Sequence, residues 1–214
     1  MLEDKEAIIF DLDGTLVDSM WMWKDIDMEF MAERGLEFPP NLQKDIEGMS
    51  FNETAMYFIE NFDIKESVDE LKVIWNDMAY YKYSHVVRPK PGAIAFIERA
   101  KKMGLKLGIA SSNSIELIMA AVTNYDLNDY FDVILSANDV PRGKPFPDVY
   151  LEVAKRLGVD PAKCLVFEDI SMGIMAGKNA GMTVCGIDDD YSADDVDKKK
   201  ELADYYIYSY DEVN

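Results

Sequence analysis

Two aspartates, Asp11 and Asp13, stand one residue apart directly after the apolar run AIIF at residues 7–10. Such a run is typical of a buried parallel strand, and ligands of open α/β sheets bind beyond the carboxyl ends of these strands. Two ionised carboxylates this close repel each other, so the pair needs either a cation or a retained proton. The pair fits a site where one carboxylate attacks a substrate while the other transfers protons. An Asp-rich turn that merely closes the strand is the alternative.

Three later segments add polar groups in a fixed order. They are a hydroxyl with backbone donors after the apolar run 106–110, a lysine ahead of a helical segment, and an acidic pair after the run 164–167. Taken alone, a strand-end serine or a single lysine is more often a turn residue or a solvated side chain. The order of all four segments favours one composite site, made by Asp11, Asp13, Ser111, Ser112, Asn113, Lys144, Glu168 and Asp169.

Together these motifs resemble those of the haloacid dehalogenase superfamily of phosphotransferases. Its four motifs read Asp-x-Asp-Gly-Thr, a Ser or Thr after a strand, a Lys, and an acidic pair, and the resemblance covers nearly the whole chain in order and spacing. The opening FDLDGTLVDS, the GMS at 48–50 and the KPFPD at 144–148 are most similar to the β-phosphoglucomutase-like branch. The resemblance implies a Mg²⁺-dependent phosphatase acting on a small phosphate monoester, such as a sugar phosphate, a phosphoglycolate-like ester or a nucleotide.

The resemblance also implies a role for each motif residue. Asp11 is expected to attack phosphorus and form an aspartyl phosphate, because an ionised carboxylate is a nucleophile near neutral pH. Asp13 is expected to protonate the leaving oxygen and then to take a proton from water. The expected metal ligands are Asp11, the backbone carbonyl of Asp13, and Asp169, with Glu168 either a direct ligand or a neighbour of one. The expected phosphate-binding residues are Ser111, Ser112, Asn113 and Lys144.

The elements that must position these residues fall into two blocks. Residues 20–83 have apolar residues at helical spacing with no strand pattern between them. Elsewhere strands at 7–10, 106–110, 132–135, 164–167 and 183–187 alternate with helices at 91–103, 115–124, 148–157 and 172–180, which predicts an α/β fold with a doubly wound parallel sheet. We therefore expect a Rossmann-like core of residues 1–17 and 87–214. A small all-helical cap of residues 18–86 is inserted after the first strand, and its two linkers, near 17–19 and 85–90, could form a hinge.

The cap sequence bears on specificity. The expected contacts to substrate are Trp21, Trp23, Gly48, Ser50 and Phe51. The mutase pattern has a histidine where this chain has Trp23 and an arginine where it has Phe51. These differences favour a plain phosphatase with a more apolar cap pocket, and a β-phosphoglucomutase-type sugar phosphomutase is the alternative.

Other functional classes fit the motif order less well. A phospho-acceptor signalling module has similar groups on a doubly wound sheet, but its acidic pair precedes the phosphorylated aspartate. Here Asp11 comes first and Asp169 comes late. A halide-releasing dehalogenase lacks the second carboxylate and the metal. A pure interaction protein would not need a reactive group at every strand end.

Composition sets further limits. With 41 acidic and 22 basic residues the formal net charge is −19, so nucleic acid is not an expected partner. Neither a signal peptide nor a membrane span is visible, and we expect a cytoplasmic monomer that acts on a small molecule. Cys164 and Cys185 lie in apolar runs and are expected to be buried thiols. The aspartates of the segment 188–195 are expected to lie in a solvated loop.

Overall fold

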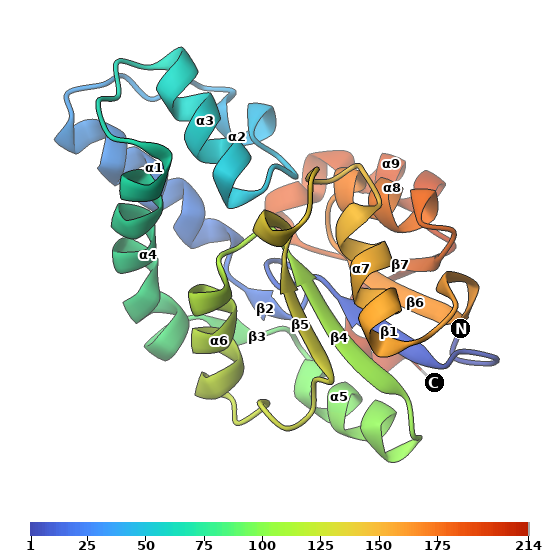
Figure 1. The fold of residues 1–214 in the computed structure, drawn as a ribbon. Helices are drawn as coiled ribbons and strands as arrows, with labels where there is room; N and C mark the ends of the chain where they lie inside the picture. The colour runs from blue at the N-terminus through green and yellow to red at the C-terminus, as the bar shows by residue number, and fades with distance from the viewer. Residues whose placement is uncertain (214) are drawn as a thin grey trace.

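The computed structural model describes residues 1–213, and its centre is one parallel sheet (Figure 1). The expected α/β fold class is confirmed. The strands follow the spatial order β5-β4-β1-β6-β7-β8, so β1 lies inside the sheet between β4 and β6. Their bounds are β1 (Ala7–Phe10), β4 (Lys106–Ser111), β5 (Val133–Ser136), β6 (Cys164–Glu168), β7 (Thr183–Ile187) and β8 (Tyr205–Ile207).

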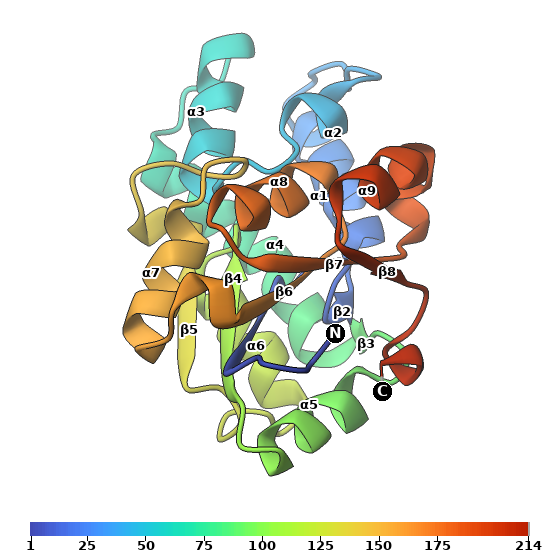
Figure 2. The same ribbon diagram turned by 90° about the vertical axis from the view of Figure 1, so that its right-hand side faces the viewer.

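Helices cover both faces of the sheet, which explains why β1 is apolar without interruption. Ile8 and Phe10 belong to the same buried cluster as helices α5 and α6, whereas Ala7 and Ile9 belong to the cluster that contains α7 and α8. Figure 2 shows α8 and α9 on one side of the sheet and α5 and α6 on the other. The bounds are α5 (Ala93–Lys102), α6 (Ile115–Asn124), α7 (Asp148–Leu157), α8 (Ser171–Asn179) and α9 (Val196–Leu202).

The segment between β1 and β4 carries four further helices that form a separate bundle, at the upper left of Figure 1. An aromatic cluster holds the bundle together: Phe58 packs edge-on against Phe30 and Trp75 with ring centroids 5.9 and 5.1 Å apart. Edge-to-face aromatic pairs contribute about 0.5–1.5 kcal/mol beyond the area they bury. The helices are α1 (Met20–Glu33), α2 (Leu42–Asp45), α3 (Phe51–Asn61) and α4 (Val68–His85).

The two connections to this bundle lie side by side. Strand β2 (Val17–Asp18) pairs with β3 (Arg88–Pro89) in an antiparallel ribbon, with Val17 opposite Pro89 and Asp18 opposite Arg88. These short strands fall in the two segments expected to be linkers. The chain therefore leaves and re-enters the core at a single place.

The acidic segment near the C-terminal end differs from the expected solvated loop. Asp189 is buried, forms an ion pair with Lys90 at 2.9 Å, and accepts a hydrogen bond from the backbone N–H of Tyr191. Burial of this carboxylate is possible because the lysine compensates its charge. The segment forms a 3₁₀ turn, η3 (Asp190–Asp195), that leads into α9. No helix within residues 1–213 is both long enough and apolar enough to cross a membrane.

Candidate active site

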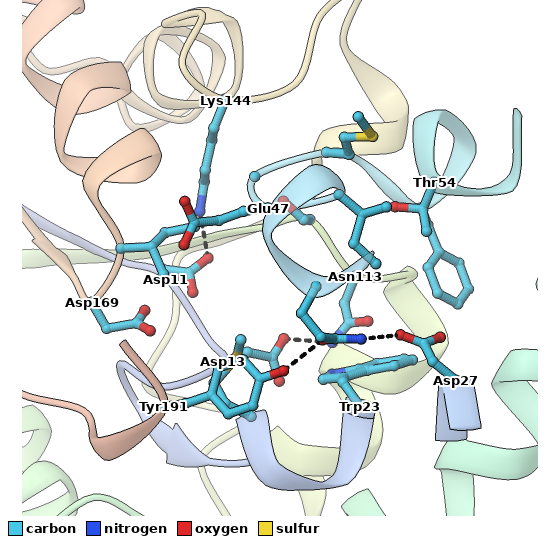
Figure 3. Close-up of a pocket in the computed structure, with 18 of the residues that line it drawn as sticks. Asp11, Asp13, Trp23, Asp27, Glu47, Thr54, Asn113, Lys144, Asp169 and Tyr191 are labelled. Atoms are coloured by element: carbon cyan, nitrogen blue, oxygen red, sulfur yellow. Dashed lines mark hydrogen bonds and ion pairs between the residues drawn. The ribbon is translucent and has the colours of Figure 1, made fainter. Parts of the chain in front are cut away.

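The carboxyl ends of β1 and β6 bring a lysine and two carboxylates together, and Figure 3 shows Lys144 and Asp11 of this group. The ammonium group of Lys144 lies 2.7 Å from Oδ1 of Asp11 and 2.5 Å from Oε1 of Glu168. All three side chains are buried. Because β1 and β6 are adjacent and in register, Asp11 and Glu168 necessarily emerge near each other, and Lys144 reaches them from the loop before α7.

Asp169 lies beside this group, and only one of its two carboxylate oxygens accepts a hydrogen bond. Its Oδ1 accepts a hydrogen bond of 2.8 Å from Thr15, while Oδ2 is buried and has no partner among the described residues. Gly14 makes the approach possible, because its φ of +72° lies in the left-handed region and a Cβ there would meet Oδ2 of Asp169 at 2.1 Å. An unpartnered buried carboxylate oxygen costs free energy unless something binds it.

The charges of the site fit a divalent cation. Ligand oxygens of Asp11, Glu168 and Asp169 lie within 4.8 Å of one another. Burial raises the pKa of Asp11 to about 7, and the charges of Glu168 and Asp13 add to the rise while Lys144 opposes it. Burial, reinforced by Glu168 and Asp11, holds the pKa of Asp169 well above its ordinary value. One lysine does not balance three carboxylates, and Mg²⁺ prefers such oxygen ligands.

Glu168 is occupied by protein donors. Besides the ion pair with Lys144, it accepts a hydrogen bond of 2.6 Å from the hydroxyl of Tyr150 and one of 3.1 Å from the backbone N–H of Asp169. Asp169, by contrast, keeps an oxygen free of donors. The structure therefore favours Asp169 over Glu168 as a direct metal ligand. Although burial favours the neutral amine, the charges of Asp11 and Glu168 outweigh it and hold the pKa of Lys144 above its ordinary value.

Asp13 faces a different set of groups, drawn from both the core and the bundle. It accepts hydrogen bonds from Ser19, from the hydroxyl of Tyr83, and from Asn113 at 2.6 Å. The same Tyr83 hydroxyl accepts from Asn113 at 2.7 Å and from the indole N–H of Trp23 at 3.0 Å. Burial is the largest influence on Asp13 and raises its pKa, although the hydrogen bonds from Ser19 and Tyr83 oppose the rise. Asp13 is thus suited to hold a proton that it can release.

The residues at the end of β4 complete the centre. Ser111 is buried, and its hydroxyl accepts a hydrogen bond of 3.1 Å from the backbone N–H of Asn113. Ser112 and Asn113 line the cavity together with Asp11 and Asp13, whereas Ser111 does not line it. Ser111 therefore shapes the turn that presents its two neighbours.

The helical bundle closes over this centre and encloses a cavity of about 160 Å³. Contact between bundle and core is direct: the backbone N–H of Phe51 donates to the carbonyl of Ser112 at 3.1 Å, and that of Gly143 donates to Glu53 at 3.2 Å. The cavity reaches from Asp11 and Lys144 to the aromatic residues of the bundle.

The predicted specificity residues separate into two groups. Trp23, Gly48 and Phe51 line the cavity. Trp21 does not line the cavity, because a step of two residues along a helix turns its side chain about 200° away from that of Trp23. Trp21 is 42% exposed, and its indole N–H donates to the carbonyl of Asp18. Ser50 caps α3 through a capping box and has a structural role outside the cavity wall.

Several cavity residues were missed by the sequence analysis. The most notable are Asp27, Gln43, Glu47, Thr54, Trp75 and Tyr191. Asp27 falls among the apolar residues of a helical stripe, which is the one signal that could have drawn attention to it. Tyr83 and Tyr150, which bind Asp13 and Glu168, had no sequence signal, because a tyrosine at helical spacing resembles any core residue.

Comparison with known proteins agrees with the motif analysis. The family model described as haloacid dehalogenase-like hydrolase matches residues 8–187. A phosphorylated carbohydrates phosphatase of Thermotoga maritima is 32% identical over 83% of this chain and 82% of its own. Hexitol phosphatase B of Escherichia coli K12 is 32% identical over 82% of this chain and 80% of its own.

The fold also matches a solved structure. A crystal structure of β-phosphoglucomutase from Clostridium difficile superimposes with a TM-score of 0.83, covering 98% of this chain and 93% of that one at 22% identity. This likeness concerns the fold. The expected family and enzyme class are confirmed, since the matched region contains the motifs that converge in the cavity. The chain belongs to the haloacid dehalogenase-like hydrolases.

Proposed function

We propose that this protein is a Mg²⁺-dependent phosphatase that hydrolyses a small phosphate monoester through an aspartyl phosphate on Asp11. The observation that carries the proposal is the buried group formed by Asp11, Lys144, Glu168 and Asp169, in which one cation faces three carboxylates. The names of the similar phosphatases support the same reaction.

In the first step, a carboxylate oxygen of Asp11 attacks phosphorus while the bond from phosphorus to the ester oxygen breaks. Asp13 donates its proton to the departing oxygen, so that an alcohol leaves. The raised pKa of Asp13 suits this role, because burial favours its protonated form. Its three hydrogen-bond donors orient the carboxyl group and stabilise the carboxylate that remains after the proton has left. Lys144 stabilises the charge on the transferring phosphoryl group.

In the second step, Asp13, now ionised, takes a proton from a water molecule. The oxygen of that water attacks phosphorus, the bond to Asp11 breaks, and inorganic phosphate is released. Ser112 and Asn113 line the cavity, and the backbone N–H of Ser112 would hold a phosphate oxygen in both steps, whereas that of Asn113 donates to the Ser111 hydroxyl. The free carboxylate of Asp11 is restored.

Asp11, Asp169 and the backbone carbonyl of Asp13 are the groups we propose to hold Mg²⁺. The bound ion would supply positive charge against the phosphate oxygens in an otherwise acidic site. We also propose that residues 18–86 act as a cap that excludes bulk water when closed. The cytoplasmic location and the monomeric state remain predictions.

The sugar phosphomutase alternative requires a group that binds a second phosphate. Within residues 1–213, Lys144 is the one basic residue that lines the cavity, and it is already paired with Asp11 and Glu168. Trp23 and Phe51 occupy the positions of the mutase histidine and arginine, and their rings lie 5.8 Å apart. Neither ring binds a phosphate as a cation does. The cavity therefore favours hydrolysis.

An assay with an aryl phosphate tests the proposal. We expect Mg²⁺-dependent release of inorganic phosphate that stops in excess chelator and returns when Mg²⁺ is restored. Acid-quenched enzyme should carry a phosphoryl group on the peptide that contains Asp11, detectable by mass spectrometry. Turnover that persists in chelator would contradict the proposed metal dependence. Rapid conversion of β-glucose 1-phosphate into glucose 6-phosphate without phosphate release would instead establish the mutase.

A further inference from the structure

Asp27 is a carboxylate in the cavity that the proposed chemistry does not use. It belongs to α1, is only 5% exposed, and lines the cap side of the cavity (Figure 3). Within residues 1–213 it has one hydrogen bond, which Gln43 donates to its Oδ2 at 2.6 Å. A buried carboxylate is costly unless donors satisfy it, so its second oxygen is available to a donor on a bound molecule.

The orientation of Asp27 depends on a contact between cap and core. The hydroxyl of Tyr191, from η3 of the core, donates to Oε1 of Gln43 at 2.7 Å. Because this bond occupies the amide oxygen, the amide nitrogen of Gln43 is directed to Asp27. Two hydrogen bonds thus connect Tyr191 of η3 to Gln43 of α2 and Gln43 to Asp27 of α1. The two bonds can form together only while the cap lies against the core. Burial raises the pKa of Asp27 to about 7, opposed by the bond from Gln43.

Above pH 7, where Asp27 is ionised, the charges around it disfavour a further anionic group on the substrate. Glu47 is a second carboxylate in the same wall, and Lys144 is held by its own two carboxylate partners. A substrate carboxylate or a second phosphate in this part of the cavity would face two acidic side chains without a free cation. Such an arrangement is repulsive in a site of low dielectric constant.

The same wall also contains hydrogen-bond donors. Thr54 offers a hydroxyl, and Trp75 has a buried indole N–H with no partner among the described residues. Substrate hydroxyl groups both donate and accept, so they can bond to Asp27 and to such donors alike. An ammonium group only donates hydrogen bonds, so it could bond to the carboxylates of this wall but would leave the donors Thr54 and Trp75 without a partner.

We propose that Asp27, oriented by Gln43 and Tyr191, is a specificity-determining residue that accepts a hydrogen bond from a hydroxyl of an uncharged leaving group. This inference rests on the proposed phosphatase function and narrows its substrate class. With Asp27 in this role, the enzyme prefers monophosphates of sugars or polyols over phosphoglycolate-like esters and bisphosphates.

Matched pairs of esters test the selection. Sorbitol 6-phosphate and 6-phosphogluconate differ at the far end by an alcohol against a carboxylate, and glucose 6-phosphate and glucosamine 6-phosphate differ by a hydroxyl against an amine. For the wild-type protein with Mg²⁺ at pH 8, where Asp27 is ionised, we expect kcat/KM to favour the alcohol over the acid by about tenfold or more, which corresponds to one hydrogen bond to a charged group. We also expect the hydroxyl sugar to be hydrolysed faster than the amino sugar. An aryl phosphate serves as the reference ester.

Two variants test whether Asp27 and Tyr191 cause the preference for the alcohol ester. Asp27→Asn should lower the sorbitol 6-phosphate to 6-phosphogluconate ratio by about tenfold, because the wall loses its charge and its strongest acceptor. Tyr191→Phe removes only the hydroxyl that orients Gln43, so it should raise KM for the polyol ester more than it lowers kcat. Asp25→Asn, an exposed position on the same helix, is the matched control for loss of one acidic charge and should keep the wild-type ratio.

The outcomes distinguish this inference from the function on which it rests. Aryl phosphate hydrolysis by a wild-type enzyme that prefers the acid or the amine would overturn the inference and leave the phosphatase intact. An unchanged ratio in Asp27→Asn would do the same. If Asp27→Asn does not fold, the KM of Tyr191→Phe decides, and an unchanged KM counts against the inference. Failure to hydrolyse any of these esters with Mg²⁺ would overturn both.

Discussion

The hydroxyl of Tyr83, near the end of cap helix α4, donates a hydrogen bond to the carboxylate of Asp13, just beyond strand β1 of the core. Asn113 and Trp23 donate to the same hydroxyl. The proposed movement of the cap away from the core would withdraw this bond from Asp13. The position of the cap and the protonation of the proposed general acid are therefore linked.

Tyr83→Phe should slow the enzyme by about tenfold with alkyl phosphates, because Asp13 loses a donor worth about 1.5–3 kcal/mol. An aryl phosphate needs less help from a general acid and should be affected less. Steady-state kcat with both esters is the measurement, and Tyr81→Phe, at an exposed position of the same helix, is the control. Equal losses with the two esters would mean that Tyr83 does not act through Asp13.

Substitution of the two aspartates should separate their roles. Asp11→Asn should abolish both turnover and phosphoenzyme, because the nucleophile is gone. Asp13→Asn should reduce turnover by about 10²–10⁴-fold, the usual contribution of general acid–base catalysis, yet still form some phosphoenzyme from an aryl phosphate. Rapid quench followed by mass spectrometry measures the phosphoenzyme. Small and equal losses in both variants would refute this division of labour.

Removal of a metal ligand should change the Mg²⁺ requirement. We expect Asp169→Asn to raise the Mg²⁺ concentration for half-maximal activity by at least about tenfold, and Thr15→Val to raise it less, because Thr15 only orients Oδ1 of Asp169. Titration of aryl phosphate hydrolysis with Mg²⁺ measures both values. Asp129→Asn removes an exposed acidic charge and should match the wild type. An unchanged requirement in Asp169→Asn would mean that the ligand lies elsewhere.

The pH dependence of stability should depend on Asp27. Burial raises its pKa from 3.8 to about 7, so between these values the folded protein keeps a proton that the unfolded chain has released. The free energy of unfolding therefore falls as the pH rises through this window, and it falls no further above the folded pKa. Asp27→Asn lacks this loss. From pH 5.5 to 8 the wild type should lose about 2 kcal/mol more than the variant, since one pKa unit corresponds to about 1.4 kcal/mol.

Urea unfolding of both proteins at the two pH values measures this difference. Asp25→Asn should follow the wild type, because its side chain is exposed. Parallel stability profiles for wild type and Asp27→Asn would show that the carboxyl group at residue 27 titrates outside this window.

Much of the core could be predicted because its strands are apolar runs that end in polar residues. The strand at 183–187 and the helices at 115–124 and 148–157 have the predicted bounds. Strand β8 was missed because it is a short edge strand whose sequence, Tyr-Tyr-Ile, lacks a long apolar run. The ribbon of β2 and β3 was missed for a related reason, since two residues are too few for any period to be visible.

The convergence of the motif residues in one site was predictable from the order of the motifs, even where the local sequence signal is weak, as at Lys144. The cap side of the cavity was not, because contacts such as the one between Gln43 and Tyr191 join residues 148 positions apart. Nothing in a single sequence pairs them. Burial of Asp27 likewise depends on how the helices pack. The alternation of polar and apolar residues along α1 does not predict which of its acidic residues becomes buried.

The ribbon of β2 and β3 makes the cap an interchangeable part. The strands at its two ends, Val17–Asp18 and Arg88–Pro89, are paired with each other, so the distance the cap must span is the same whatever its length. Closing a longer loop between fixed ends costs little, about 0.6 kcal/mol for each doubling. A bundle of another size or sequence could therefore replace this one while Val17 stays opposite Pro89 and the six-stranded sheet remains undisturbed. If residues 18–86 determine specificity as proposed, exchange of this bundle should change the substrate and leave the chemistry of the core unchanged.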